Sequence, residues 1–242
     1  MKEVKKFLIK SGFVLALVIF LFSGYSLMSQ FLIRREAANE HQKIISIAQN
    51  NEETGVTERE FDFDTLLEIN DDFIGWLYVG GTNINHPIVQ GDDNEFYLTT
   101  TFSGNNNPAG AIFMDMRNSS DFSDNQTIIY GHNMLDGTMF HDLTRFQEQS
   151  FFNRYSTFTI YTSSGSRKYE IFSAYVISAY TDTYHMALAN GEAFASYLEY
   201  ITELSMIKTG ITPTATDKIV SLSTCEYQFE HARMIVHGRL IE

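Results

Sequence analysis

The chain has 242 residues, of which 44% are hydrophobic and 14% aromatic, and its formal net charge is −13 at pH 7. This length allows one sizeable domain with an appendage, and the apolar content excludes a disordered or fibrous protein. The strong negative charge argues against nucleic acid as a partner, because phosphates repel an acidic surface.

The N-terminal segment is strongly apolar. Residues 11–28 read SGFVLALVIFLFSGYSLM and contain no charged residue, so a helix there is long enough to cross a membrane. Four lysines precede this segment, and the positive-inside rule therefore predicts a cytoplasmic N-terminus. A cleaved signal peptide is the alternative, but no small-x-small cleavage site follows directly. We expect residues 1–33 to form a single-pass anchor in the cell membrane, in contact with lipid, with the remaining chain outside the cytoplasm.

Helix-forming residues follow the anchor. Residues 34–47 (REAANEHQKIISIA) predict a helical stalk, and residues 61–70 (FDFDTLLEIN) predict a second short helix. Residues 34–72 are therefore expected to form a stalk with N-terminal helices, ahead of a domain that spans residues 73–242.

The remainder of the chain reads as short strands separated by turn residues. Strands are predicted at residues 76–79, 88–90, 111–114, 127–130, 157–161, 168–178, 219–223 and 234–241. Many short strands at this spacing favour an antiparallel barrel or sandwich.

One helix interrupts the strands. Residues 190–207 (NGEAFASYLEYITELSMI) carry an apolar stripe, with Asn190 as a candidate N-cap. The stripe consists of Phe194, Tyr197, Leu198, Ile201 and Leu204. The predicted fold class is therefore mainly β, a barrel of about eight strands with N-terminal helices and a helix in the loop before the last two strands.

The single cysteine, Cys225, ends the apolar strand IVSLSTC. A lone thiol outside the cytoplasm cannot form a disulfide within its own chain, so it is either buried and inert or kept for chemistry. Arg233 begins the next predicted strand. If the two strands are neighbours, Arg233 lies across from Cys225, where its permanent charge could stabilise a thiolate or an oxyanion.

A thiol nucleophile also needs a group that transfers a proton to the departing amine, and histidine is the usual one. His132 follows a predicted strand directly after a glycine, in YGHNM, which suits a side chain that projects into a cleft. His231 lies on a loop near Cys225, and His237 lies within a strand and could face outward or into the core. Spacing alone gives His132 a small preference.

Three segments together resemble the sortase family. SLSTCEYQFEHARMIVHGRL is similar to the family's TLxTC signature with its following arginine and strand, although Ser221 replaces the usual threonine. IIYGHNM resembles the family's strand-end histidine motif, and HPIVQGDDNEFYLTTTFSGNNNPAGAIFMD resembles its N-terminal barrel region. The predicted helices before the barrel and before the cysteine strand are similar to those of class B. The likeness extends from about Gly75 to the C-terminus.

The resemblance implies a closed sortase-type barrel and a membrane-anchored cysteine transpeptidase of Gram-positive bacteria. Cys225 matches the family's nucleophile, His132 its general acid/base and Arg233 its oxyanion-stabilising arginine. The thiolate is then expected to cleave an NPxT-like sorting motif of a surface protein and to form a thioacyl-enzyme, which an amine of the cell wall resolves. Candidate substrate-binding residues are Ser223, Glu226, Asn94, Leu98, Tyr130, Thr181 and Tyr184.

This chemistry requires no cofactor. The acidic pairs Asp71–Asp72 and Asp92–Asp93 lack the spacing of a calcium loop, and the sequence has no zinc or phosphate-loop motif, so no metal site is predicted. Three alternatives stay open: a pilus-polymerising sortase that uses a pilin lysine as acceptor, a cysteine endopeptidase that uses water, and a noncatalytic membrane-tethered binding module.

Overall fold

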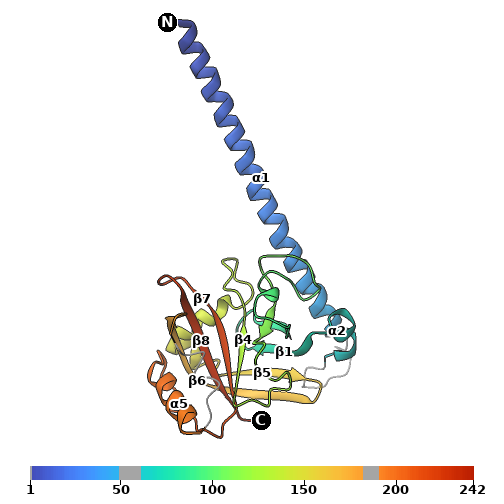
Figure 1. Ribbon diagram of the computed structural model, residues 1–242, viewed down its shortest axis with the longest axis vertical. Helices are drawn as coiled ribbons and strands as arrows, with labels where there is room; N and C mark the ends of the chain where they lie inside the picture. Colours follow the sequence, from blue (N-terminus) through green and yellow to red (C-terminus); the bar gives the residue numbers. More distant parts are fainter. Residues whose placement is uncertain (1, 49–60, 182–190) are drawn as a thin grey trace. The chain divides into compact units, whose positions relative to one another are not determined.

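The computed structural model describes residues 2–48, 61–181 and 191–242, and it divides into two compact units, Met1–Lys43 and Ile44–Glu242. The described part of the first unit lies within one continuous helix, α1 (Lys2–Ala48), drawn in blue in Figure 1. An 18-residue window of this helix has a mean hydropathy of 2.2, so its length and composition suffice to cross a membrane. The helix includes residues 34–47, for which the sequence predicts helix.

The second unit is built on a closed barrel of eight strands, in the order β1-β2-β3-β4-β7-β8-β6-β5 (Figure 1). The strands are β1 (Phe73–Val79), β2 (Asn85–Val89), β3 (Ile112–Met114), β4 (Gln126–Tyr130), β5 (Thr157–Thr162), β6 (Gly165–Ser178), β7 (Ile219–Glu226) and β8 (Ala232–Leu240). Each strand overlaps one of the eight segments predicted from the sequence, although most bounds differ, and the expectation of a mainly β barrel is confirmed.

The expectation of purely antiparallel pairing is wrong for two strand pairs. β2 pairs with β3 in parallel, and β4 pairs with β7 in parallel, while the other six pairings are antiparallel. A parallel pair needs a long crossover instead of a tight turn. The described part of the crossover from β4 to β7 contains β5, β6 and three helices. Periodicity within single strands carries no information on such a distant partner.

Short helices occupy the connections. They are α2 (Phe63–Ile69), η1 (Phe96–Leu98), η2 (His141–Gln147), α3 (Gln149–Phe152) and α5 (Glu192–Glu203). Asp62 caps α2, because its side chain accepts a hydrogen bond from the backbone N–H of Thr65 at 3.0 Å. The sequence predicts α2 and α5 but not η1, η2 or α3. η1 and α3 have only three and four residues, and η2 is a 3₁₀ helix, which lacks the α-helical period.

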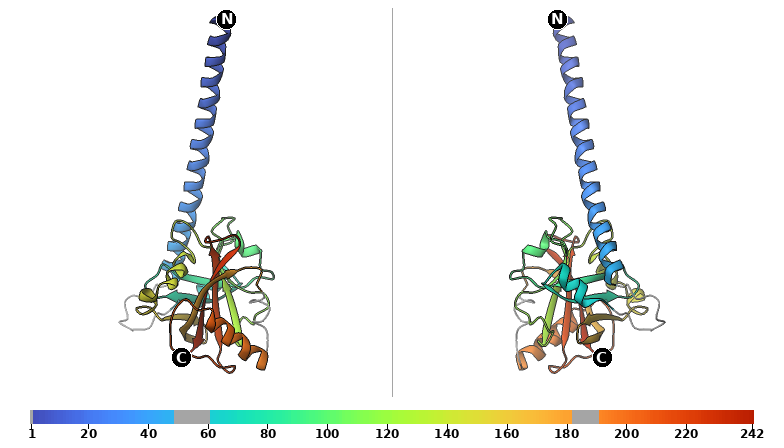
Figure 2. Two further views of the ribbon diagram at one scale, coloured as in Figure 1. Left: turned by 90° about the vertical axis from the view of Figure 1, so that its left-hand side faces the viewer. Right: turned by 90° about the vertical axis from the view of Figure 1, so that its right-hand side faces the viewer.

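The apolar stripe of α5 covers one outer face of the barrel. Phe194, Tyr197, Leu198 and Ile201 are buried, as the predicted stripe requires, and they pack with residues of β4, β6, β7 and β8. The helix begins after Gly191, and the predicted cap Asn190 lies outside the described residues. Figure 2 shows α5 in orange at one end of the red strands β7 and β8, with the turn between these strands at the other end.

Candidate active site

Cys225 lies near the end of β7, the strand that separates β4 from β8 in the barrel. Its thiol is free and its side chain is half-buried. Side chains alternate along a strand, so Cys225 shares a face with Ser223 and with Ile219, which packs against α5. The first six residues of β7 are buried on both faces, because one face lines the barrel and the other contacts α5; only the last two are partly exposed. The fold thus brings the thiol to the surface at the end of a rigid strand.

Arg233 is the register partner of Cys225 in the antiparallel pair β7–β8. Partners in such a pair place their side chains on the same face of the sheet, with Cβ atoms about 4.5–5.5 Å apart. Among the described residues, the guanidinium makes one hydrogen bond, from Nη1 to the carbonyl of Ala232 at 3.1 Å, and no ion pair. Its remaining donors are therefore not held by a carboxylate of the described chain.

His132 lies beyond the end of β4, on the opposite side of β7 from Arg233. The parallel register pairs Tyr130 with Ser223, and Gly131 continues it by donating its N–H to the Ser223 carbonyl at 3.2 Å. His132 lies two residues after Tyr130, and Cys225 lies two residues after Ser223. If this register continues past β4, His132 is level with Cys225. The structure thus brings the three predicted residues Cys225, His132 and Arg233 to one end of three adjacent strands.

The imidazole of His132 has a defined hydrogen bond. Its Nε2 lies 2.7 Å from the carbonyl oxygen of Leu98, at the end of η1. A carbonyl oxygen can only accept a hydrogen bond, so Nε2 carries a hydrogen and donates a hydrogen bond to the Leu98 carbonyl. Leu98 is one of the candidate substrate-binding residues, and its side chain is exposed. Its contact with the histidine through the backbone was not foreseen.

Tyr130 and Ser223 lie side by side, because they are register partners on β4 and β7, next to the thiol. The Tyr130 hydroxyl donates to Asp115 Oδ2 at 2.9 Å, and Arg117 binds the same carboxylate through two nitrogens at 2.7 and 2.8 Å. Burial raises the pKa of Asp115, but the hydrogen bonds from Arg117 and Tyr130 outweigh it and hold this pKa below the ordinary value. The carboxylate thus fixes the orientation of the Tyr130 ring.

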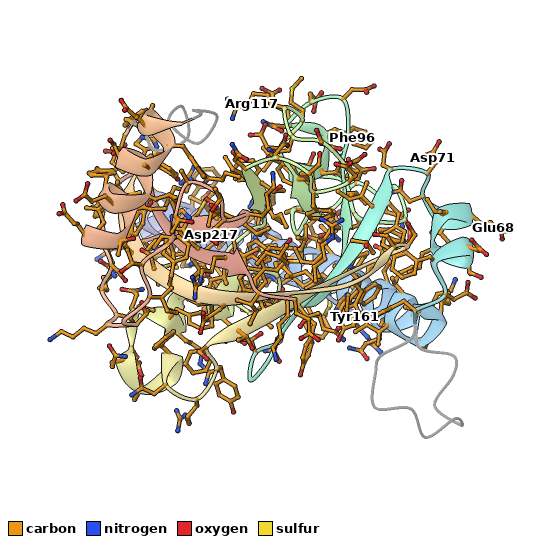
Figure 3. All side chains as sticks on the ribbon, turned by 90° about the horizontal axis from the view of Figure 1, so that it is seen from below. Glu68, Asp71, Phe96, Arg117, Tyr161 and Asp217 are labelled. Carbon is orange, nitrogen blue, oxygen red and sulfur yellow. The ribbon has the colours of Figure 1, made fainter. Side chains whose placement is uncertain are left out.

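Asn94 lies on the loop between β2 and η1, where its Oδ1 accepts the backbone N–H of Met116 at 2.8 Å. This contact joins the loop after β2 to the loop after β3. Figure 3 shows the neighbouring side chains Phe96 and Arg117 on the same side of the barrel. Asn94 is therefore on the same connection as Leu98 and is bonded to the loop that carries Arg117. Its side-chain oxygen already accepts a hydrogen bond from the backbone N–H of Met116.

The remaining predicted substrate residues are Glu226, Thr181 and Tyr184. Glu226 follows Cys225 at the end of β7, so strand alternation directs its side chain to the opposite face from the thiol. Thr181 lies just beyond β6, in a turn in which its N–H donates to Ser178, the partner of Ala232 on β8. Thr181 is thus at the same end of the barrel as Arg233. Tyr184 lies outside the described residues.

The other two histidines considered from the sequence do not join this cluster. His237 is buried, with Nδ1 2.7 Å from Ser221 Oγ and Nε2 2.9 Å from the Tyr175 hydroxyl. Burial lowers its pKa to about 3, so this imidazole is neutral at pH 7. His231 is exposed in the β7–β8 turn, where its ring contacts that of Tyr180 at a centroid distance of 4.8 Å.

Sequence reasoning missed the residue that follows the histidine. Asn133 Nδ2 donates to the carbonyl of Cys225 at 2.8 Å, and its Oδ1 lies 2.8 Å from His141 Nδ1. Thr224 Oγ1 donates to the Gly131 carbonyl at 2.7 Å, so the residues that flank His132 are both bonded to β7. An asparagine directly after the candidate histidine was the available signal, because its short amide can bond to backbone across a strand end.

Comparisons with known proteins bear on the family of the chain and on its fold. A family model described as the Sortase domain matches residues 77–241. Sortase B of Listeria monocytogenes serovar 1/2a is 33% identical over 250 residues, which cover 99% of this chain and 99% of the relative. An X-ray structure of Clostridium perfringens sortase B is 36% identical with a TM-score of 0.70, and the match covers 74% of this chain and 100% of that chain. A Staphylococcus aureus sortase B–substrate complex is 30% identical with a TM-score of 0.76, and the match covers 86% of this chain and 97% of that chain.

The matched region contains all eight strands except the first residues of β1, and therefore the whole cluster around Cys225. Together, the family model, the sequence identity over the full length and the shared barrel show that this chain belongs to the sortase family of cysteine transpeptidases, in its B class.

Proposed function

We propose that this chain joins surface proteins to an amine of the cell wall, with Cys225 as nucleophile, His132 as general acid/base and Arg233 as the group that stabilises the oxyanion. The observation that carries the proposal is the order of three strand ends. β7 presents Cys225 between the His132 segment after β4 and Arg233 at the start of β8. A nucleophile, a proton carrier and a fixed cation are the three components that acyl transfer to a thiol needs.

In the first half-reaction, the Cys225 thiolate attacks the threonine carbonyl carbon of an NPxT-like sorting motif. The carbonyl electrons move onto oxygen, and the Arg233 guanidinium stabilises the resulting negative charge. The intermediate then breaks its C–N bond, and the departing amine takes a proton from the His132 imidazolium. The products are a thioacyl-enzyme at Cys225 and the released C-terminal fragment.

In the second half-reaction, an amine attacks the thioester carbonyl. Neutral His132 accepts a proton from the attacking nitrogen, the C–S bond breaks, and Cys225 leaves as a thiolate. A thiolate is a good leaving group near neutral pH, so this step needs no stronger acid at the sulfur. The enzyme returns to its starting state with a new amide bond formed.

We propose that the peptide lies along the face that Ser223 and Tyr130 share with Cys225. Leu98 and Asn94 would contact it from the loop after β2, and Thr181 and Tyr184 from the segment after β6. Glu226 points to the opposite face of β7, so it would reach a polar side chain of the motif only around the end of this strand. This arrangement is supported by the common position of the described members at one end of the barrel.

The acceptor is proposed to be a peptide amine of the peptidoglycan precursor. A solved sortase B is described in complex with triglycine, and the Staphylococcus aureus enzyme in complex with a substrate. These partners belong to those proteins, but their class fits the two half-reactions above. A pilin lysine is the alternative acceptor, and water would make the chain an endopeptidase.

We further propose that residues 1–33 anchor the chain in the cell membrane with a cytoplasmic N-terminus, that residues 34–72 form the stalk with N-terminal helices, and that residues 73–242 are the catalytic barrel. The mean hydropathy of 2.2 in α1 supports the anchor. The lysines before the apolar segment support the orientation.

Mass spectrometry of the full chain in detergent tests the proposal. The chain is incubated with peptides that carry NPxT-like motifs, with and without triglycine as the amine. We expect a covalent adduct on Cys225 that is absent in Cys225→Ala, and a peptide–glycine product only when the amine is added. A hydrolysed product that no amine changes would favour the endopeptidase. Failure of every peptide to form an adduct would support a noncatalytic binding module.

A further inference from the structure

Asn133 is a buried polar residue, 5% exposed, that follows the candidate histidine directly. Three hydrogen bonds converge on it from separate segments. Its Nδ2 donates to the Cys225 carbonyl, its Oδ1 meets His141 Nδ1, and its backbone carbonyl accepts the Tyr227 hydroxyl at 2.9 Å. The residue thus connects the end of β4, the end of β7, the start of η2 and the β7–β8 turn.

The chemistry of these partners fixes the orientation of the amide. The Cys225 carbonyl can only accept, so the Asn133 atom that faces it must be the nitrogen. The oxygen therefore faces His141, and Nδ1 of that ring must carry the proton that it donates. His141 thus holds the Asn133 amide in the one orientation that bonds to the nucleophile's own residue.

These bonds restrict the separation between His132 and Cys225. Before His132, the Gly131 carbonyl accepts the Thr224 hydroxyl; after it, the Asn133 side chain bonds to Cys225. Moving the backbone of His132 relative to the backbone of Cys225 requires breaking one of these bonds. A displacement of about 1 Å between reacting groups can cost on the order of 100-fold in rate.

We propose that Asn133 is a positioning residue of the transpeptidation reaction, which sets the Cys225–His132 geometry, and that His141 orients its amide. This inference rests on the proposed roles of Cys225 and His132. Asn133 does not touch the reacting atoms; it acts through the two backbone segments that carry them. A residue that only held the fold together would change stability without changing the chemical step.

The test compares four variants of the full chain in detergent. Asn133→Ala removes the bond to Cys225, and His141→Leu removes only the donor that orients the amide. His141→Asn places a side-chain nitrogen close to the position of Nδ1 and restores a donor. Asn118→Ala is the matched control, because the Asn118 amide also bridges backbone, from Gln126 to Ile128, at the other end of β4.

The measurements are the single-turnover rate of thioacyl formation at Cys225, the KM for the sorting-motif peptide and the thermal midpoint of unfolding. For Asn133→Ala we expect the acylation rate to fall about 10- to 100-fold with KM within about threefold of the parent. For His141→Leu we expect a fall of about three- to tenfold, about the effect of one ordinary hydrogen bond, and for His141→Asn a rate near that of the parent. Asn118→Ala should lower the thermal midpoint and leave the rate within about twofold of the parent.

Parent-like acylation rates in Asn133→Ala and His141→Leu overturn the positioning role, as does an equal fall in His141→Leu and His141→Asn. If Asn133→Ala does not fold, the two His141 variants decide the matter. A parent chain that forms no adduct at all contradicts the proposed function instead, so the two failures are distinct.

Discussion

Cys225 and Arg233 face one another across the antiparallel pair β7–β8, so the thiol and the guanidinium leave the barrel on the same face. The turn that joins the strands is short, and the relationship is therefore local and rigid. His132 reaches the same position from the other side of β7 through a parallel pairing with a distant segment. The cation is thus fixed by local geometry, and the histidine by the closure of the whole barrel.

Replacing Arg233 with lysine tests whether the planar guanidinium matters beyond its charge. Lysine keeps a positive charge but loses the fixed fork of donors that can bind a developing oxyanion. We expect Arg233→Lys to lower kcat/KM for a sorting-motif peptide on the order of 100-fold, mainly in kcat. The measurement is steady-state cleavage in the presence of triglycine.

Arg239→Lys is the matched control for that variant, because Arg239 lies on the same strand and pairs with Glu170 at 3.1 Å, away from the thiol. We expect its kcat/KM to match that of the parent. Equal activity of Arg233→Lys and the parent would show that a nearby charge is sufficient, and the oxyanion role would then lose its geometric basis.

Gly131 has no room for a side chain. A Cβ atom there would lie 2.4 Å from Ile112 Cδ1 and 2.9 Å from the Phe140 ring, both buried. We expect Gly131→Ala to lower the free energy of unfolding by about 1–3 kcal/mol and to lower kcat, because relief of the clash moves the adjacent His132. Denaturant titration followed by the fluorescence of Trp76, the single tryptophan, measures the first effect.

Gly80→Ala serves as its control. A Cβ at Gly80 meets only the Tyr155 ring, at the ordinary contact distance of 3.8 Å. We expect a change of less than about 1 kcal/mol in the free energy of unfolding and an unchanged kcat. A Gly131→Ala protein as active as the parent would mean that the strand end accommodates a methyl group without moving the histidine.

The barrel was predictable from the sequence because each strand carries its own signal. Apolar runs such as residues 219–223 follow turn residues, and the apolar stripe of α5 shows at helical spacing. The parallel pairing of β4 with β7 was not predictable in this way, since its partners lie far apart in the chain and neither strand encodes the other. Only the family resemblance linked the two segments before the structure did.

Part of the candidate site was likewise predictable from the sequence, and part of it was not. The facing of Cys225 and Arg233 was predicted from the sequence on the condition that the two strands are neighbours, and the structure pairs them in this register. The contacts of His132 with the Leu98 carbonyl and of Asn133 with the Cys225 carbonyl use backbone atoms, which residue types do not reveal. For Glu226 the residue type was misleading. It is adjacent to Cys225 in sequence, but strand alternation puts its side chain on the opposite face of β7.

The Asp115–Arg117 pair predicts an acid-dependent loss of stability. Burial raises the pKa of Asp115, and the bonds from Arg117 and Tyr130 lower it further than burial raises it. A carboxylate with a depressed pKa contributes stability that is present above its unfolded value of about 3.9 and is lost as the pH falls through the folded value. Removing the guanidinium takes away the largest influence that lowers the pKa of Asp115, so this pKa rises.

We therefore expect Arg117→Met to lower the free energy of unfolding by about 1–3 kcal/mol at pH 7, a range reduced by the partial exposure of Arg117. The difference from the parent should shrink as the pH falls from the pKa of Asp115 in the variant to its lower pKa in the parent, because below that point the carboxylate is protonated in both proteins. Denaturant titrations at pH 7 and pH 3 provide the comparison. A difference that is the same at both values would show that packing, and not the ion pair, accounts for the loss.

His237 also predicts that stability falls as the pH falls, but here burial, and not hydrogen bonding, lowers the pKa. Burial lowers its folded pKa to about 3, against about 6.5 in the unfolded chain, so between these values the unfolded state binds a proton that the folded state excludes. Stability then falls with decreasing pH by up to about 1.4 kcal/mol per unit in this window. We expect His237→Gln to be less stable than the parent at pH 7 but to lack this part of the dependence of stability on pH. The difference in the free energy of unfolding between the two proteins should therefore narrow by about 3 kcal/mol towards pH 4.

Tyr175→Phe is the control, because it removes a hydrogen-bond partner of the ring without removing the titrating group. It should lower stability while keeping the parent's dependence of stability on pH. Equal slopes in the parent and in His237→Gln would mean that the ring is protonated without cost, and that the buried site opens to water before the barrel unfolds.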